Sequence, residues 1–439
     1  MNNHSRILKS LVIIILLLPL CSCKSDASKG LHLELSLDRK NYIIGTSYND
    51  EELKAEREIV IPDKMFGIPV TIIDNGAFKE FVNLKTINLP DGITRIGEQA
   101  FMGCSSLKNI EISDNVISIG TGAFSYCNNL KYNKYDNGLY LGNEKNPYVV
   151  LVTTSSEDIT SIKIHSKTKI IMNNALYDCH NLNNIDIPES VIEIGDYAFA
   201  YCESLESISI PNSVTSIGCG AFLGCDSLDY YEADNGLYLG NEKNPYVVFV
   251  KAAEKTIESI TVKDNAKIIM DYAFLGCEKL KKLELPESLI IINYEALLKK
   301  EVSYERYEEY SLWDSLEYNE YDNGLYLGNE KNPYVVLVKA KANSVESLEI
   351  NDETKIIIAE NELFINVNTV KIPQSVVTMN NYPYARIIEC EMDHQPDGWK
   401  EYSGAMNYTC IVWEYNDFKI WSIKQFVDKI SHRLKWGDN

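Results

Sequence analysis

An alanine, usually followed by phenylalanine, recurs in this chain at a fixed interval of 23 residues, and a cysteine commonly follows after two further residues. The alanines at this position are Ala77, Ala100, Ala123, Ala175, Ala198, Ala221, Ala273 and Ala296. A constant period of this length is typical of stacked units that each contact only their neighbours. The period therefore predicts a solenoid, which reaches 439 residues by adding coils and not by dividing into globular domains.

The regular interval is interrupted by an insertion that itself repeats. Steps of 52 residues separate Ala123 from Ala175 and Ala221 from Ala273. The inserted phrase DNGLYLGNEKNPYVV begins at Asp136, Asp234 and Asp322. Its turn residues between apolar runs predict a β-hairpin at the same edge of the solenoid in each copy. The hairpin tyrosines then form either an aromatic binding row or a packing contact with the solenoid body, and we favour packing: Tyr140, Tyr148, Tyr238, Tyr246, Tyr326 and Tyr334.

One coil reads SLESISIPNSVTSIGCGAFLGC, in which Leu205, Ile208 and Ile210 alternate as in a strand with one buried face. Gly218 allows a bend, and Phe222 fills the opposite wall so that successive phenylalanines stack inside the tube. A period of 23 lies within the leucine-rich-repeat range. We therefore expect a leucine-rich-repeat solenoid, mostly β and irregular, with one strand per coil, three inserted β-hairpins, caps at both ends and a short C-terminal helix.

Outward strand positions are expected to line up along the inner, concave sheet. The resulting strip is polar and mildly acidic, and its candidate ligand-binding residues are Asn88, Glu111, Asp186, Ser209, Thr261 and Glu284. Solenoid curvature presents such a strip to extended partners, so one interpretation is a recognition surface. The other is an ordinary solvated face, because the strip lacks the aromatic anchors of an interface hot spot.

Six of the 11 cysteines occupy the same place in their coils: Cys104, Cys127, Cys179, Cys202, Cys225 and Cys277. Small and apolar, cysteine fits a tight corner, whereas zinc sites need close pairs or added histidines. We expect a column of buried thiols without metal. Cys390 and Cys410 flank the last segment and either form a disulfide or stay free.

The first 22 residues predict a secretory signal peptide, with basic Arg6 and Lys9 before an apolar run that is too short to span a bilayer. The sequence Leu20-Cys21-Ser22-Cys23 resembles the bacterial lipobox, which implies lipid attachment at Cys23. Two acyl signals hold a protein stably on a membrane. The expected location is therefore membrane-anchored and exported, at the cell surface or, in a Gram-negative host, the outer membrane.

Composition argues against several classes of function. Without its signal the chain has 40 basic and 63 acidic residues. Nucleic-acid binding depends on basic clusters, so a nucleic-acid partner is not expected. No stretch combines a nucleophile, a base and an orienting acid, and the histidines lack metal-ligand spacing. We therefore expect no catalytic residues, no cofactor and no metal site.

Phrases such as IPNSVTSIGCGAF and LPDGITRIGEQAFMGCSSL resemble the BspA-like, or Treponema pallidum type, leucine-rich-repeat family. The resemblance covers most of the chain, from about Ile59 to Pro373. It implies a surface adhesin that binds host matrix and plasma proteins or other cells, and it specifies the fold better than the ligand. The segments LHLELSLDRKNYIIGTSYNDEEL and CEMDHQPDGWKEY resemble the family's N-terminal and C-terminal caps.

A second candidate site is the insertion EVSYERYEEYSLW, residues 301–313. It places aromatic side chains beside glutamates, with Tyr304, Tyr307, Tyr310 and Trp313 at every third position. The alternative is a dispensable insertion, and deleting the segment is expected to leave folding intact because the flanking register is preserved. The sequence of residues 416–439, a segment rich in basic residues, predicts an amphipathic helix. This helix docks on the solenoid, on a membrane surface or on a partner.

The expected organisation is a signal peptide (1–22), a lipidated linker (23–30), an N-terminal cap (31–58), the repeats with hairpin insertions (59–384), a C-terminal cap (385–415) and the helical tail (416–439). Two functions stay open: a surface adhesin for an extracellular protein or glycan, and an envelope scaffold that organises neighbouring surface proteins.

Overall fold

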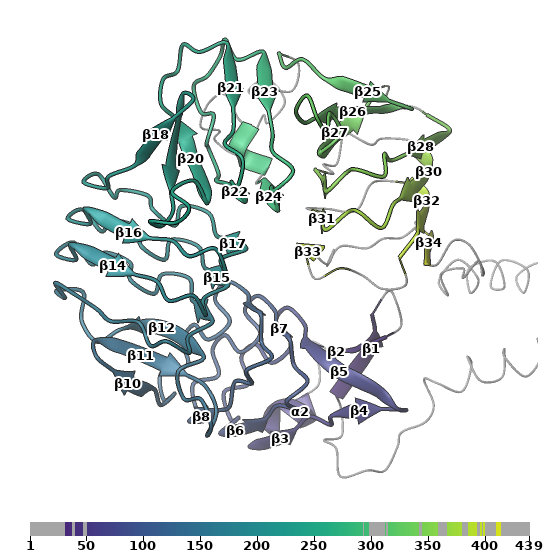
Figure 1. The fold of residues 1–439 in the computed structure, drawn as a ribbon. Helices are drawn as coiled ribbons and strands as arrows, with labels where there is room; N and C mark the ends of the chain where they lie inside the picture. The colour runs from purple at the N-terminus through teal and green to yellow at the C-terminus, as the bar shows by residue number, and fades with distance from the viewer. Residues whose placement is uncertain are drawn as a thin grey trace, which may run out of the picture.

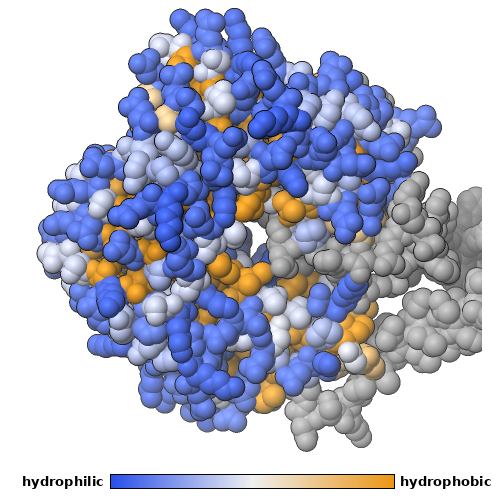
Figure 2. Space-filling view, viewed as in Figure 1, coloured by the Kyte–Doolittle hydropathy of each residue, from blue (hydrophilic) through white to orange (hydrophobic). Residues whose placement is uncertain are grey.

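The computed structural model describes residues 31–36, 40–46, 51–292, 294–297, 312, 315–341, 345–358, 367–379, 385–392, 396, 398–399 and 410–413. The described chain is a strongly curved β-solenoid, which confirms the predicted fold (Figure 1). Its coils follow an arc, and the space-filling view shows a mainly hydrophilic face with an opening near the centre of the arc (Figure 2).

Coils of the solenoid contribute strands to two sides of the tube, whereas one strand per coil was expected. The outer side has four parallel ladders. These ladders are β3 (Glu58–Val60), β6 (Thr86–Asn88) and β8 (Asn109–Ile110); β14 (Asn184–Asp186) and β16 (Ser207–Ser209); β21 (Ser259–Thr261) and β23 (Lys282–Glu284); and β28 (Ser347–Glu349), β30 (Val367–Ile372), β32 (Ala385–Cys390) and β34 (Cys410–Trp413).

The inner side carries shorter strands, which also pair in parallel. They are β5 (Ile68–Ile73), β7 (Arg95–Ile96) and β9 (Ser118–Ile119); β13 (Ile170–Ile171), β15 (Glu193–Ile194) and β17 (Ser216–Ile217); β22 (Ile268–Ile269) and β24 (Ile291–Ile292); and β29 (Ile356–Ile357), β31 (Thr378–Met379) and β33 (Gly398–Trp399). In Figure 1 these strands lie toward the centre of the arc, and the outer ladders lie at its rim.

Each insertion forms part of a three-stranded antiparallel meander whose last strand starts a new inner ladder. The meanders are β10 (Asn133–Tyr135), β11 (Gly138–Leu141) and β12 (Val150–Thr154); β18 (Tyr231–Ala233), β19 (Gly236–Leu239) and β20 (Val248–Ala252); and β25 (Asn319–Tyr321), β26 (Gly324–Leu327) and β27 (Val336–Ala340). They divide the solenoid into four modules: module 1 (β3–β9), module 2 (β10–β17), module 3 (β18–β24) and module 4 (β25–β34).

A hairpin of β1 (Leu31–Leu35) and β2 (Tyr42–Thr46) stacks on the first inner ladder, since β2 pairs in parallel with β5. Further short elements are α2 (Glu51–Ala55), β4 (Lys64–Met65) and the 3-10 turn η1 (Tyr294–Leu297). The first ladder therefore does not end in an exposed strand edge at β5, which would otherwise invite pairing with another chain.

The tube is filled by the stacked phenylalanines that the period predicted. The rings of Phe78 and Phe101 are 5.4 Å apart, those of Phe101 and Phe124 are 5.5 Å apart, and each pair is nearly parallel. Phe199 and Phe222 repeat the stack in module 2 at 5.6 Å. Burying each ring contributes about 1.5–3 kcal/mol, so each coil depends on the coils next to it.

The predicted cysteine column is also present, and its thiols are buried and free. The Sγ of Cys104 donates to the carbonyl of Phe78 at 3.1 Å, and Cys127 donates to Phe101 at the same distance. Cys202 and Cys225 make the equivalent bonds in module 2. Each of these thiols thus serves as a weak donor to a carbonyl of the preceding coil.

The strip of candidate residues lies on the outer ladders and not on the concave side. Figure 1 places β14 and β16, which carry Asp186 and Ser209, at the rim of the arc. The strip is also interrupted, because the outer strands form four separate ladders. Alternation along a strand shows which side chains face inward, but it does not determine the direction in which the stack bends.

The insertion at 301–313 is not fully dispensable. Of its residues the structure describes Leu312, which is buried in the core of module 3 and whose N–H donates to the carbonyl of Leu297 at 2.9 Å. This burial argues against the expectation that complete deletion leaves folding intact, because the deletion would remove Leu312. Removing a buried leucine costs about 2–5 kcal/mol.

Glycine at the inner bend is required by the stacking distance between coils. A Cβ on Gly218 would lie 2.4 Å from the backbone nitrogen of Asp196 in the preceding coil. We predict that Gly218→Ala lowers the free energy of unfolding by at least about 1–3 kcal/mol, measured by urea denaturation. Gly92→Ala is the control, since its nearest backbone contact is 3.4 Å. Equal effects of the two changes would contradict this explanation.

Candidate binding surface at the module junctions

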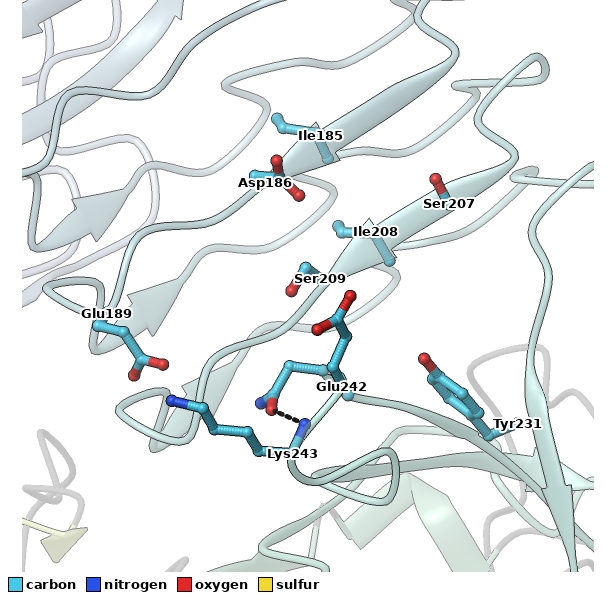
Figure 3. Close-up of a pocket in the computed structure, with 11 residues that line it drawn as sticks. Ile185, Asp186, Glu189, Ser207, Ile208, Ser209, Tyr231, Glu242 and Lys243 are labelled. Carbon is cyan, nitrogen blue, oxygen red and sulfur yellow. Dashed lines mark hydrogen bonds between the residues drawn. The ribbon is translucent and has the colours of Figure 1, made fainter.

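A groove of about 430 Å³ lies on the outer side where module 2 meets module 3. Figure 3 shows strands β14 and β16 on one side, and the loop with Glu242 and Lys243 on the other. Asp186 and Ser209, both predicted as site residues, line this groove. The structure therefore brings together two candidates that are 23 residues apart in the sequence, next to a loop that begins about 30 residues later.

Backbone pairing positions these side chains. Asp186 and Ser209 are register partners in the parallel pair of β14 and β16. The insertion then continues the ladder, because the Ile210 N–H donates to the Gly240 carbonyl and the Asn241 side-chain amide donates to the Ile210 carbonyl, both at 2.8 Å. The ladder edge is thereby covered by the same loop that forms one wall of the groove.

Asn241 also fixes the loop itself. Its Oδ1 accepts hydrogen bonds from the N–H groups of Lys243 and Asn244, each at 3.0 Å, which closes an Asx turn (Figure 3). Glu242 and Lys243 are exposed on this turn. The groove thus has polar walls held by backbone hydrogen bonds and does not depend on flexible side chains alone.

The charge of the groove is mostly negative. Asp186, Glu189 and Glu242 line it together with one cation, Lys243, and Figure 3 shows Glu189 and Lys243 pointing toward one another. Tyr231 of β18 adds an exposed ring. Such a lining favours a ligand with hydrogen-bond donors or positive charge.

The other two junctions have the same backbone arrangement. At the first, the Ile112 N–H donates to Gly142, and the Asn143 amide donates to the Ile112 carbonyl. At the third, Leu285 pairs in the same way with the loop of Gly328 and Asn329. The corresponding strand positions are Asn88 and Glu111 at the first junction, and Thr261 and Glu284 at the third.

The third junction differs in charge. Glu284 contacts the Lys282 ammonium at 2.6 Å and accepts a hydrogen bond from the Thr261 hydroxyl at 2.9 Å. Lys282, followed by Thr261, lowers the pKa of Glu284. This carboxylate is already neutralised by a neighbour, so the three junctions present different chemistry on one backbone.

Sequence reasoning missed Glu189, Tyr231, Glu242 and Lys243, which come from turns and from the insertion. A signal was available, because the residues Asn-Glu-Lys recur identically in all three insertions although two of them are exposed. Identical exposed residues in repeated segments do not follow from core packing.

The hairpin tyrosines pack, as favoured from the sequence. Tyr140, Tyr238 and Tyr326 are fully buried, and each meets a half-buried tyrosine of the same insertion edge-on at 5.2–5.6 Å. The hydroxyl of Tyr238 accepts a hydrogen bond from the N–H of Lys263. These rings therefore join the insertion to the solenoid and do not form an exposed binding row.

Several predicted site residues fall outside the described part of the chain. They are Cys23, Tyr304, Tyr307, Tyr310 and Trp313, and the tail 416–439 lies outside it as well. Within the described residues, no helix is both long and apolar enough to cross a bilayer.

A disulfide between Cys390 and Cys410 is not supported. In the pair of β32 and β34, Cys390 lies opposite Trp413, and Cys410 lies opposite Ile387. The two cysteines are thus offset by three residues along parallel strands, roughly 10 Å, whereas disulfides need Cα atoms within about 7 Å. Cys390 is a free, buried thiol.

The inner corner between modules 2 and 3 brings together Cys219, Asp271 and Glu295, whose donor atoms lie within 4.8 Å of one another. Burial, followed by the charges of Asp271 and Glu295, raises the pKa of Cys219 to about 12. The corresponding corner between modules 1 and 2 has Thr121 bonded to Asp196 at 2.7 Å. We therefore regard these corners as contacts between modules, with the protonated Cys219 thiol in one of them.

Glu193 occupies the corner between modules 1 and 2. Its carboxylate accepts a hydrogen bond from the Ile119 N–H at 3.3 Å, across the boundary between modules 1 and 2. Burial raises its pKa to about 7, although hydrogen bonds from Ser118 and Ile119 act in the opposite direction. The folded protein therefore binds this proton more tightly than the unfolded chain does.

Because the folded pKa is raised, the charged form of Glu193 destabilises the fold, and stability is lost as pH rises from about 4.5 through 7. We predict that Glu193→Gln is more stable than the wild type at pH 8, by on the order of 2 kcal/mol, with a smaller difference near pH 4.5. Urea denaturation at both pH values measures this, with exposed Glu206→Gln as control. A pH-independent difference would refute the assignment.

Comparison with known proteins matches the repeats. Six copies of the BspA type leucine-rich repeat region match residues 55–144, 154–242 and 250–309. The chain is similar to the crystal structures of a T. pallidum leucine-rich repeat protein and of a leucine-rich repeat protein from Bacteroides ovatus, at 24% and 20% identity and a TM-score of 0.27 each. The former match covers 47% of this chain and 91% of that one, and the latter covers 89% and 78%.

A third similar structure is a leucine-rich cell surface protein from Faecalibacterium prausnitzii, at 22% identity and a TM-score of 0.26, covering 80% of this chain and 89% of that one. The chain matches no curated protein.

Proposed function

Because the chain belongs to the BspA-type leucine-rich repeat family, we propose that it is a non-catalytic binding protein of the cell surface, which adheres to an extracellular protein or glycan. The observation that carries the proposal is the outer groove, whose backbone arrangement occurs at three junctions. The inserted loops at the three junctions are separated by 98 and 88 residues in the sequence, and the same loop sequence occurs at each junction. Three weak contacts on one rigid arc give avidity that a single groove lacks.

We further propose that the insertion with Tyr304, Tyr307, Tyr310 and Trp313 contributes to adhesion. Aromatic side chains next to carboxylates favour a protein partner. Deletion of 301–310 tests this role and leaves the buried Leu312 in place. Binding that survives this deletion unchanged excludes Tyr304, Tyr307 and Tyr310, and Trp313→Ala tests the remaining ring.

The adhesion proposal is tested with soluble residues 24–439 and a panel of immobilised matrix proteins and glycans. For a ligand found in this way, we predict that Glu242→Ala weakens binding about tenfold, because it removes one charge-assisted contact. The triple change Glu144→Ala, Glu242→Ala and Glu330→Ala should weaken it by a much larger factor, since the avidity is lost. Binding is measured by surface plasmon resonance.

The control is Glu349→Ala, which removes an exposed outer-ladder carboxylate in module 4, where no insertion follows. If the triple variant binds like the wild type, the grooves are not the site. If the panel yields no ligand while whole-cell crosslinking captures envelope proteins, the adhesin proposal fails and the scaffold function takes its place.

We also propose that Cys23 carries the lipid anchor, which is supported by the lipobox-like sequence before it. We predict that Cys23→Ala moves the protein from the detergent-rich to the aqueous phase in Triton X-114 partition of whole cells. Cys21→Ala is the matched control and should stay in the detergent phase, because it changes a residue that is not lipidated. Retention of the Cys23 variant in the detergent phase would mean a different anchor.

A further inference from the structure

Module 2 exposes a cluster of large apolar side chains on the wall between its inner and outer ladders. Tyr177, Tyr201 and Leu223 come from three successive coils and are 42%, 40% and 49% exposed. The two rings meet edge-on with centroids 5.4 Å apart. We call these three residues the tyrosine patch. Contiguous exposed aromatic residues of this kind often mark an interaction site.

Tyr201 is held in a backbone conformation that disfavours it. The second residue after the wall phenylalanine, or the leucine that replaces it, has a positive φ in seven coils: Glu80, Gly103, Tyr126, Asp178, Tyr201, Gly224 and Gly276. At a φ of 61°, a residue with a Cβ costs about 1–2 kcal/mol compared with glycine. Glycine is used at three of these positions, so the fold does not require a side chain there.

Modules 1 and 2 provide an internal comparison, since their coils are related by a shift of 98 residues and each of the two modules is followed by the same inserted phrase. The residues of module 1 that correspond to the tyrosine patch are Lys79, Gly103 and Ser125. These three positions are therefore occupied without aromatic side chains in module 1. Tyr201 therefore bears a conformational cost that its counterpart Gly103 avoids. The same cost is borne at this position of their coils by Glu80, Tyr126 and Asp178. Because the Tyr201 ring is 40% exposed, core packing does not account for this cost, which indicates a role for the ring other than folding.

The ring of Tyr201 packs in a defined position. A Cβ on Gly224 in the next coil would lie 2.7 Å from the Tyr201 ring, so the ring lies against the bare glycine backbone. The ring is thus positioned before any partner arrives, which lowers the entropy cost of binding.

The charge around the patch selects the partner. Each of the three coils adds an exposed carboxylate next to the patch in sequence, namely Asp178, Glu203 and Asp226. The nearby imidazole of His180 already faces Asp158 at 3.9 Å. Tyrosine rings beside carboxylates attract a cationic side chain by cation–π and charge interactions. The whole chain, at a net charge of −21, favours the same kind of partner.

We propose that the tyrosine patch is a second interaction surface, separate from the junction grooves, which binds an arginine or lysine side chain of a partner polypeptide against Tyr201 and Tyr177. Tyrosine and arginine are the residue types that dominate binding energy at protein interfaces. The proposal uses no residue of the grooves and stands whether or not the grooves bind a ligand.

The test is Tyr201→Gly, which installs the residue of module 1 at this position. Random peptides displayed on phage are selected against residues 24–439 at about 0.15 M salt, where distant charges are screened. We predict that selected peptides are rich in arginine or lysine and bind Tyr201→Gly at least about tenfold more weakly than the wild type. The thermal midpoint of this variant should stay equal or rise, because the backbone strain is relieved.

The matched control is Tyr126→Gly. Tyr126 occupies the corresponding position in a coil of module 1, has a φ of 62° and is 68% exposed. The Tyr126→Gly variant should gain the same stability as Tyr201→Gly and should bind the selected peptides as tightly as the wild type. The triple glutamate variant of the grooves should also keep it, which separates this proposal from the proposed function.

Three results would overturn the proposal. Selected peptides that bind Tyr201→Gly as tightly as the wild type would remove the patch from binding. Selected peptides without basic residues, or binding of a glycan array that depends on Tyr201, would assign a different occupant. A lower thermal midpoint for Tyr201→Gly would show that the ring serves folding.

Discussion

The structure depends on strands that are buried on both faces. In the first meander, Leu141 and Val150 belong to the core of module 1, whereas Tyr140 and Leu151, next to them in the chain, belong to the core of module 2. Side chains alternate across a strand, so one face of each inserted sheet packs on the core of the preceding module and the other face packs on the core of the next module. Burial on both faces leaves the strand residues of the insertion little freedom, which explains why Leu-Tyr-Leu and Tyr-Val-Val are identical in its three copies.

The same constraint produces the groove between modules 2 and 3. The last strand of each inserted meander starts a new inner ladder, so the outer ladder of the preceding module ends there. The last backbone groups of that outer ladder need hydrogen-bond partners. The loop that follows the second strand of the inserted meander supplies them through Gly240 and Asn241. The next residues, Glu242 and Lys243, then lie at the rim of the ended ladder. The loop that covers the ladder edge at each junction is therefore a consequence of how modules are joined, and between modules 2 and 3 it lines the groove.

Sequence periodicity predicted the features that repeat within one coil, such as the stack of Phe78 and Phe101 and the buried thiol of Cys104. It missed features set by relations between modules. The direction of bending depends on how one module packs on the next, at contacts such as Ile119 with Glu193, 74 residues apart. The groove forms where Asp186 lies near residues of the insertion, and no local sequence pattern links those two segments.

Repetition inside the chain separates what the fold requires from what it permits. Where modules 2 and 3 agree at a buried strand position, as at Tyr140 and Tyr238, the side chain belongs to the core of its module. Where modules 1 and 2 differ at solvent-accessible positions of one backbone, as with the exposed Glu111 and the half-buried Ser209, the fold accepts either residue. Packing does not explain such differences. Specificity for a partner is therefore to be sought among exposed residues, both the loop residues that recur at each junction and the ladder positions at which the modules differ, and the uniform backbone holds these positions at fixed intervals along the arc.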